Sequence, residues 1–148
     1  MAYIPSNPNG QTGAANSAPV VIASDQTAVN TSLQEVATGG ATVKHVVSLS
    51  STNPTPIKSG TGKVTGWYIY NNNGTARKVA FHDTAGTPQA GTAVYFSIVI
   101  PALSAANCSF PAGINFSTGI AITTTIGLLD SDGTAVAAND LIINIFYK

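Results

Sequence analysis

The chain has 148 residues, enough for one domain with an appendage but too few for two full domains. Only 8% of the residues are charged, where about a quarter is usual, and the six basic residues balance the six acidic ones. The basic residues are scattered, which excludes the basic patch that nucleic-acid binding requires. A neutral surface made polar by Thr, Ser, Asn and Gly does little to prevent self-association, so the composition favours a subunit of an assembly.

The N-terminal residues lack the basic and apolar regions of a secretory signal, and no apolar run reaches the length of a membrane span. The single cysteine, Cys108, allows no internal disulfide. We therefore expect a protein made in a reducing cytoplasm, with no membrane partner.

Residues 1–41 differ from the rest of the chain. They contain three prolines, many Gly, Ala, Ser and Asn residues, and only two charges, Asp25 and Glu35. Such a segment cannot build a core of its own. Two interpretations stay open: a disordered tail, or an extended arm that becomes ordered on a partner. The low charge and the apolar stretch Pro19-Val20-Val21-Ile22 favour the arm.

From residue 42 onward, short β-like runs alternate with turn residues, and no stretch has a helical period. The predicted strands are 42–50, 63–71, 77–83, 93–100, 107–110, 119–125 and 141–147. The turn Asn71-Asn72-Asn73-Gly74 is typical of a hairpin connection. The predicted fold class is all-β: a single β-sandwich or jelly-roll domain, 42–148, preceded by an extended N-terminal arm, 1–41.

Several predicted strands are apolar on both faces. Tyr68 and Tyr70 lie on the face of their strand opposite to Trp67, and Val99 and Ile142 lie on nominally outer faces. A small domain must cover such a second face with a neighbouring subunit or with the arm. Tyr68, Tyr70, Val99 and Ile142 are therefore our candidates for an oligomer interface.

No arrangement typical of a catalytic site is present in the sequence. His82 adjoins Asp83, but neighbours on a strand face opposite ways, and no Gly-x-Ser-x-Gly motif supplies a nucleophile. We expect His45 and His82 at the surface or an interface, and Cys108 as a buried, inert thiol. The turn at 130–133 lacks the further ligands of a calcium loop. We therefore expect a protein that is not an enzyme and holds no cofactor or metal.

Two parts of the sequence resemble tailed-bacteriophage virion proteins. The first is Ala-Pro-Val-Val-Ile-Ala-Ser-Asp-Gln at 18–26. The second covers most of the domain. It includes Gly-Trp-Tyr-Ile-Tyr-Asn at 66–71, Phe-His-Asp at 81–83, Gly-Thr at 91–92, Pro-Ala-Gly-Ile-Asn-Phe-Ser-Thr-Gly-Ile at 111–120 and Asp-Ser-Asp at 130–132. These motifs consist of turn and core residues, so they indicate a particular fold but give little information about the function.

The resemblance implies a virion protein of the capsid decoration (cement) or head-fibre type, with a homotrimer as the common state. The expected function is to stabilise the head from the capsid surface, through the oligomer and through contacts of Pro19, Val20, Val21 and Ile22 with the major capsid protein or other virion subunits. The alternative is a tail or head-fibre appendage that recognises the host surface through loops at 71–75 and 83–92.

Overall fold

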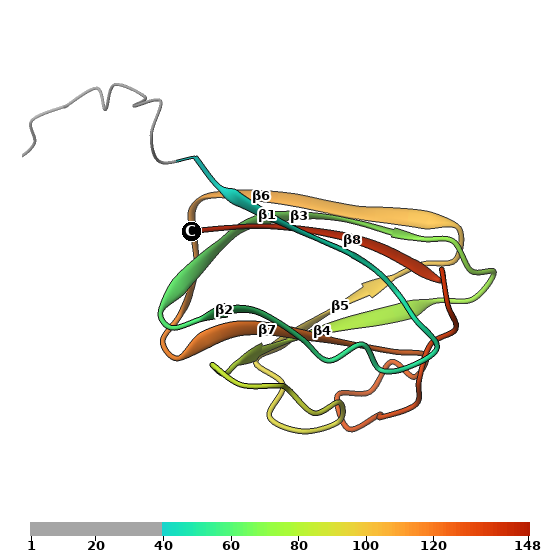
Figure 1. The fold of residues 1–148 in the computed structure, drawn as a ribbon. Helices are drawn as coiled ribbons and strands as arrows, with labels where there is room; N and C mark the ends of the chain where they lie inside the picture. The colour runs from blue at the N-terminus through green and yellow to red at the C-terminus, as the bar shows by residue number, and fades with distance from the viewer. Residues whose placement is uncertain (1–39) are drawn as a thin grey trace, which may run out of the picture. The chain divides into compact units, whose positions relative to one another are not determined.

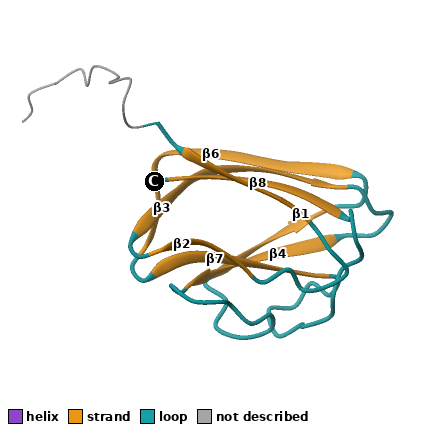
Figure 2. Ribbon diagram, in the orientation of Figure 1, coloured by secondary structure: helices purple, strands orange, loops and turns teal. Residues whose placement is uncertain are grey.

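The computed structural model describes residues 40–148, which form eight strands and no helix (Figures 1 and 2). The all-β fold class is confirmed for this part of the chain. The arm, with Pro19, Val20, Val21 and Ile22, lies outside the described residues. The strands are β1 (Thr42–Val47), β2 (Thr55–Ser59), β3 (Gly62–Asn71), β4 (Arg77–Asp83), β5 (Phe96–Ile100), β6 (Ser104–Phe116), β7 (Gly119–Thr125) and β8 (Leu141–Tyr147).

The strands form two four-stranded antiparallel sheets, which lie in two layers in Figure 2. The first sheet has the order β1-β8-β3-β6, and the second has the order β2-β7-β4-β5. The first strand thus pairs with the eighth, the second with the seventh, the third with the sixth and the fourth with the fifth. Only the connection from β4 to β5 stays within one sheet, because every other pair of consecutive strands is divided between the two layers.

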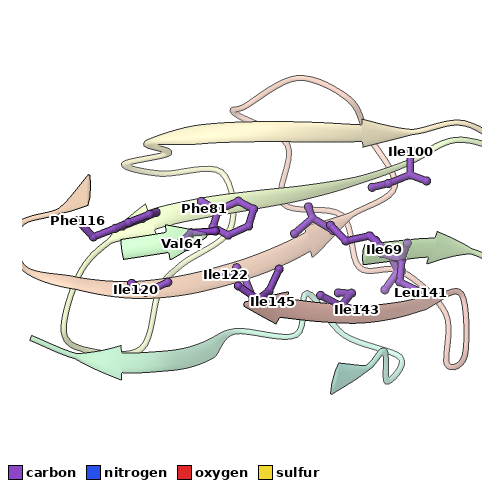
Figure 3. Close-up of a cluster of buried hydrophobic side chains, with 12 residues drawn as sticks. Val64, Ile69, Phe81, Ile100, Phe116, Ile120, Ile122, Leu141, Ile143 and Ile145 are labelled. Carbon is purple, nitrogen blue, oxygen red and sulfur yellow. The ribbon is translucent and has the colours of Figure 1, made fainter. Parts of the chain in front are cut away.

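One hydrophobic core lies between the two sheets (Figure 3). Strand β8 illustrates why: Leu141, Ile143 and Ile145 alternate with more polar or exposed positions, and all three are fully buried. Aromatic rings join the layers at one part of the core, where Trp67 of β3 lies 5.9 Å from Phe81 of β4. The fully or almost fully buried members of the core are Val64, Ile69, Val79, Phe81, Ile100, Phe116, Ile120, Ile122, Val136, Leu141, Ile143 and Ile145.

The hairpin predicted at 71–74 is wrong, because this segment crosses from the first sheet to the second. Strand β3 already has β6 and β8 on its two sides, so β4 cannot pair with it. The Asn71 side chain instead fastens the crossing. Its amide nitrogen donates to the carbonyl oxygens of Thr75 (2.9 Å), Ile100 (3.1 Å) and Pro101 (3.0 Å).

Two edge strands depart from the prediction, and both contain a proline. Strand β6 is longer than the predicted 107–110 and runs through Pro111, where the register against β3 shifts between Val64 and Gly66. Strand β2 was not predicted at all, and it contains Pro56. Both are edge strands, where a residue without an N–H group is tolerated.

Candidate interaction surface

The side of the first sheet that points away from the core is the candidate functional site. The strand register aligns its residues across the sheet: Val47 lies opposite Ile142, Ile142 opposite Tyr70, and Tyr70 opposite Ala105. We call this set the outer face. It consists of Val43, His45 and Val47 of β1, Ile142, Asn144 and Phe146 of β8, Tyr68 and Tyr70 of β3, and Ala105, Asn107 and Ser109 of β6.

The outer face carries apolar side chains and no charged ones. Its most exposed large apolar residues are Val43 (53% exposed), Tyr68 (45%), Val47 (39%) and Ile142 (37%). Lys63 lies at its margin, beyond the register shift, and its ammonium donates to Ala112 O at 3.3 Å. Because burying an unpaired charge is costly, a face without charges can be covered by another protein at low cost.

The polar groups at the centre of the outer face are paired with one another. His45 Nδ1 donates to Asn144 Oδ1 at 2.9 Å, since an amide oxygen can only accept. Asn144 Nδ2 in turn donates to Tyr68 O at 3.5 Å. His45 and Asn144 therefore satisfy part of each other's hydrogen-bonding capacity within the face.

Three of the four predicted interface residues come together on this face. Tyr70 lies directly opposite Ile142, and Tyr68 is two positions along the same side of β3. Val99 does not join them, because it belongs to β5 in the second sheet, where it is 45% exposed. The interface itself stays a prediction.

The outer side of the second sheet is covered by the chain's own loops. Lys78, Ala80 and His82 of β4 are buried although they alternate with the core residues Val79 and Phe81. The connections 84–95 and 126–140 lie over this side in Figure 1 and touch each other, since a Cβ atom on Gly91 would lie 2.8 Å from Ser131 O. The loops cover the part of this face formed by β4, whereas Val99 of β5 stays exposed at its edge.

Lys78 is among the largest fully buried side chains of the described residues, and the sequence analysis did not predict its burial. Its ammonium donates to Leu129 O and lies 3.5 Å from Asp130 Oδ1. The four apolar CH₂ groups of lysine pass beneath the loop while the nitrogen reaches its oxygen partners. A basic residue in a strand gives no sequence signal that a later loop will cover it.

The prediction of a surface or interface position is wrong for His82, which is buried within the same layer. Its Nδ1 donates to Ala93 O at 3.2 Å, so its Nε2 accepts from the Thr123 hydroxyl at 2.9 Å. Burial lowers the pKa of His82, and the nearby Lys78 charge acts in the same direction, against the backbone hydrogen bonds of Ala93 and Thr92. The ring is therefore held neutral between the sheet and the loop.

We expect the His82→Gln variant to have a flatter dependence of stability on pH between about 7 and 5. In the wild type the unfolded chain binds a proton below a pKa of about 6.5, while the folded ring resists it, so stability is present above that pH and is lost as pH falls. The loss is at most about 1.4 kcal/mol per pH unit. Urea unfolding at several pH values measures it. The exposed His45→Gln variant is the control, and an equal flattening there would contradict the role of His82.

Asp83 faces away from His82 and fastens the turn between β6 and β7. One carboxylate oxygen accepts from the Ser117 hydroxyl (2.6 Å) and the Ser117 N–H (3.0 Å), and the other from the N–H groups of Thr118 (2.7 Å) and Gly119 (3.1 Å). These bonds, the Ser117 hydroxyl first, lower the pKa of Asp83 to about 2. The carboxylate thus has a structural task in the turn.

Asp132 likewise holds a turn together. It accepts hydrogen bonds from the N–H of Gly127 (3.0 Å) and from the N–H (3.1 Å) and hydroxyl (2.8 Å) of Thr134. The Thr134 hydroxyl contributes most to lowering the pKa of Asp132. Among residues 40–148, no three His, Cys, Asp or Glu side chains come together as metal ligands would.

A buried ion pair braces the loops at the end of the domain where β3 and β5 finish. Arg77 Nε donates to Asp140 Oδ2 at 2.7 Å, and Asn73 Nδ2 donates to Asp140 Oδ1 at 2.9 Å. The Ala137 N–H donates to the same carboxylate at 3.1 Å. Burial raises the pKa of Asp140, but these hydrogen bonds outweigh it and hold the pKa below its ordinary value.

The two loops proposed for host recognition do not form one site at a common end. The connection after β3 and the connection after β4 leave opposite ends of β4, a strand of seven residues, or about 23 Å of extended chain. The first is pinned by Asn71 and Asp140, and the second folds over the second sheet. Cys108, expected to be buried, is half-buried on β6 beside Trp67.

No protein-family model, no curated protein and no solved structure matches this chain. In the part of the chain that the structure describes, no helix is long and apolar enough to cross a membrane.

Proposed function

We propose that this protein is a structural subunit of a tailed-phage particle: a capsid decoration (cement) protein that binds the head as a homo-oligomer, with a trimer as the expected state. The observation that carries the proposal is the uncharged outer face, with Val43, Val47, Tyr68 and Ile142 exposed on it. A protein that worked alone in solution would usually keep charge on such a surface. The resemblance of the sequence to virion proteins supports a place in the phage particle and does not favour one role there.

We further propose that the two layers are a β-sandwich of the jelly-roll type. The support is the pairing pattern, in which strand one lies beside eight, two beside seven, three beside six and four beside five. This pattern arises when one long antiparallel hairpin, each arm of which is divided into four strands, is rolled into two sheets. Jelly rolls recur in viral capsid domains, which fits a particle subunit.

The proposed mechanism is physical. Copies of the domain associate through the outer face, and the linked arms, with Val20, Val21 and Ile22, contact neighbouring capsid subunits. Linking several weak arm contacts in one oligomer raises their effective concentration, so the oligomer binds more tightly than a single arm could. Bound oligomers that join capsid subunits would help the head to resist the pressure of the packaged DNA.

Deleting residues 1–41 is expected to leave a folded domain that no longer binds heads purified without this protein. Co-sedimentation with such heads measures binding, and circular dichroism measures folding. Full binding by the truncated chain would contradict the role of the arm.

The Tyr68→Lys variant tests the outer face separately. It is expected to weaken self-association, and through lost avidity to reduce head binding by about 10²-fold or more. Ala135→Lys adds the same charge to an exposed loop position away from the outer face and serves as the control. Wild-type association and binding by Tyr68→Lys would exclude the outer face as the oligomer interface.

One observation favours the alternative of host recognition by a tail or head-fibre appendage. Leu49, Leu103 and Leu129 are exposed on connecting loops, two of which are braced by hydrogen bonds to Asn53 and Asn73. Apolar side chains exposed on braced loops offer a contact surface to another molecule. Immunogold labelling of intact virions separates the two functions, since label over the head supports decoration and label at tail or fibre tips supports host recognition.

A further inference from the structure

The four edge strands of the two sheets differ in how they are protected against pairing with another chain. An edge strand has unpaired backbone groups, and soluble proteins block such edges with prolines, bulges or inward-pointing charges. Strand β1 carries Lys44 on the same side as Val46, which packs against the core. Strand β2 contains Pro56 and a register shift, and β6 contains Pro111 and a register shift. Three edges therefore carry at least one blocking feature.

Strand β5 carries none of these features. Its sequence, Phe-Ser-Ile-Val-Ile at Phe96–Ile100, contains no charge and no proline, and its register against β4 is unbroken. Apart from that ladder, the only hydrogen bond that the described residues make to the backbone of β5 is the one from the Asn71 amide to Ile100 O, at the end of the strand. Val99 is exposed beside the free edge. An uncharged, β-branched edge of this kind readily accepts another strand.

We propose that β5 pairs antiparallel with β5 of a second copy of this chain, so that two four-stranded sheets become one continuous sheet across a two-fold axis. The occupant is a second copy because the segment is compatible with itself. In a two-fold contact the same strand is present on both sides, so any charge on it would be repeated close by on the other copy, and β5 has no charge.

The register that pairs all five residues is centred on Ile98 and fixes the cross-strand neighbours. It places Ser97 of one copy opposite Val99 of the other, and Phe96 opposite Ile100. The small hydroxyl side chain of Ser97 leaves room for the branched Val99. This contact is independent of the proposed function, because it uses the edge of the second sheet, whereas the outer face belongs to the first.

The experiment is sedimentation-velocity analysis of the full chain with matched variants at Val99. The Val99→Lys variant puts an ammonium group at the pairing edge, where it is expected to raise the apparent dissociation constant at least about tenfold and to halve the mass of the wild-type assembly. Val99→Thr keeps a branched, uncharged side chain and is expected to keep the wild-type mass. Circular dichroism and thermal unfolding check that each variant folds.

Comparison with Tyr68→Lys separates this contact from the outer face. If both contacts exist, each single variant loses one of them and the double variant is a monomer. An unchanged mass for Val99→Lys, or a wild type that is monomeric at high concentration, would overturn the edge pairing. If Tyr68→Lys loses association and Val99→Lys keeps it, the proposed function stands and the edge pairing is rejected.

A cross-linking measurement keeps the inference testable if Val99→Lys fails to fold. Ser97→Cys and Val99→Cys are combined in a Cys108→Ala background, which removes the native thiol. Directly opposed cross-strand residues have Cβ atoms from about 4.5 Å apart, the upper end of the range for a disulfide, so a small shift of the strands lets the bond form. The expected result is an intermolecular dimer on non-reducing gels after mild oxidation. Absence of this dimer at a concentration where the wild type associates would contradict the proposed pairing.

Discussion

Replacing Phe81 with alanine is expected to lower the free energy of unfolding by about 3–5 kcal/mol, the cost of a large cavity in a well-packed core. Phe81 is fully buried, stacks on Phe96 at 4.5 Å between ring centroids, and lies 6.3 Å from Phe116. It also contacts Trp67 from the other sheet, so its removal weakens the packing between the layers. A domain of this size has a free energy of unfolding of only about 5–15 kcal/mol, so the folded state of the variant should be only marginally stable.

Urea unfolding followed by Trp67 fluorescence measures this effect, and the chain has a single tryptophan. The exposed Val43→Ala variant is the control and should change stability by no more than about 0.5 kcal/mol. A loss below about 1.5 kcal/mol in Phe81→Ala would contradict the described packing, because cavities of this size cost more.

The Asp140→Ala variant is expected to lose about 3–5 kcal/mol, because it leaves the Arg77 guanidinium buried without its partner. It also removes the acceptor of the Asn73 amide and of the Ala137 N–H, so the loops after β3 and before β8 lose a shared anchor. We therefore expect faster proteolysis in these two loops, in addition to the lower unfolding free energy.

A second substitution distinguishes the orphaned charge from the lost anchor. Adding Arg77→Met to Asp140→Ala removes the unpaired guanidinium, so part of the lost stability should return. The proteolytic sensitivity of the loops should stay high, since the anchor is still missing. If the double variant is less stable than Asp140→Ala by the full cost of a second buried substitution, the guanidinium is not the source of the loss.

The sequence predicted what depends on neighbours along the chain. Alternation of Leu141, Ile143 and Ile145 with other positions identified β8 and its buried side, and the same reasoning put Tyr68 and Tyr70 outside. It could not predict which strands pair, because Thr42 is paired with Tyr147 and no local pattern encodes a partner so distant. The turn at 71–74 was misread for this reason: its residues suit a tight turn, but the next strand lies in the other sheet.

The sequence also could not predict which strand residues the loops would bury. Lys78 and His82 look like outward-facing polar residues of β4, and they are buried only because the connections 84–95 and 126–140 fold over them. Because these loops cover β4 of the second sheet, the candidate interaction surface lies on the first sheet. Only the structure distinguishes the side of the second sheet that the chain covers itself from the outer face of the first sheet, which is left open.

The pairing of the first strand with the last has a consequence for how the chain folds on the ribosome. Strand β1 is synthesised first, yet its partner β8 is complete only when Tyr147 has been made. Such non-local pairings are slow to form, and until they form the apolar strands in between stay accessible. The low charge of the chain offers little repulsion between nascent copies. Expression at lower temperature, or with more chaperone, should therefore raise the soluble yield.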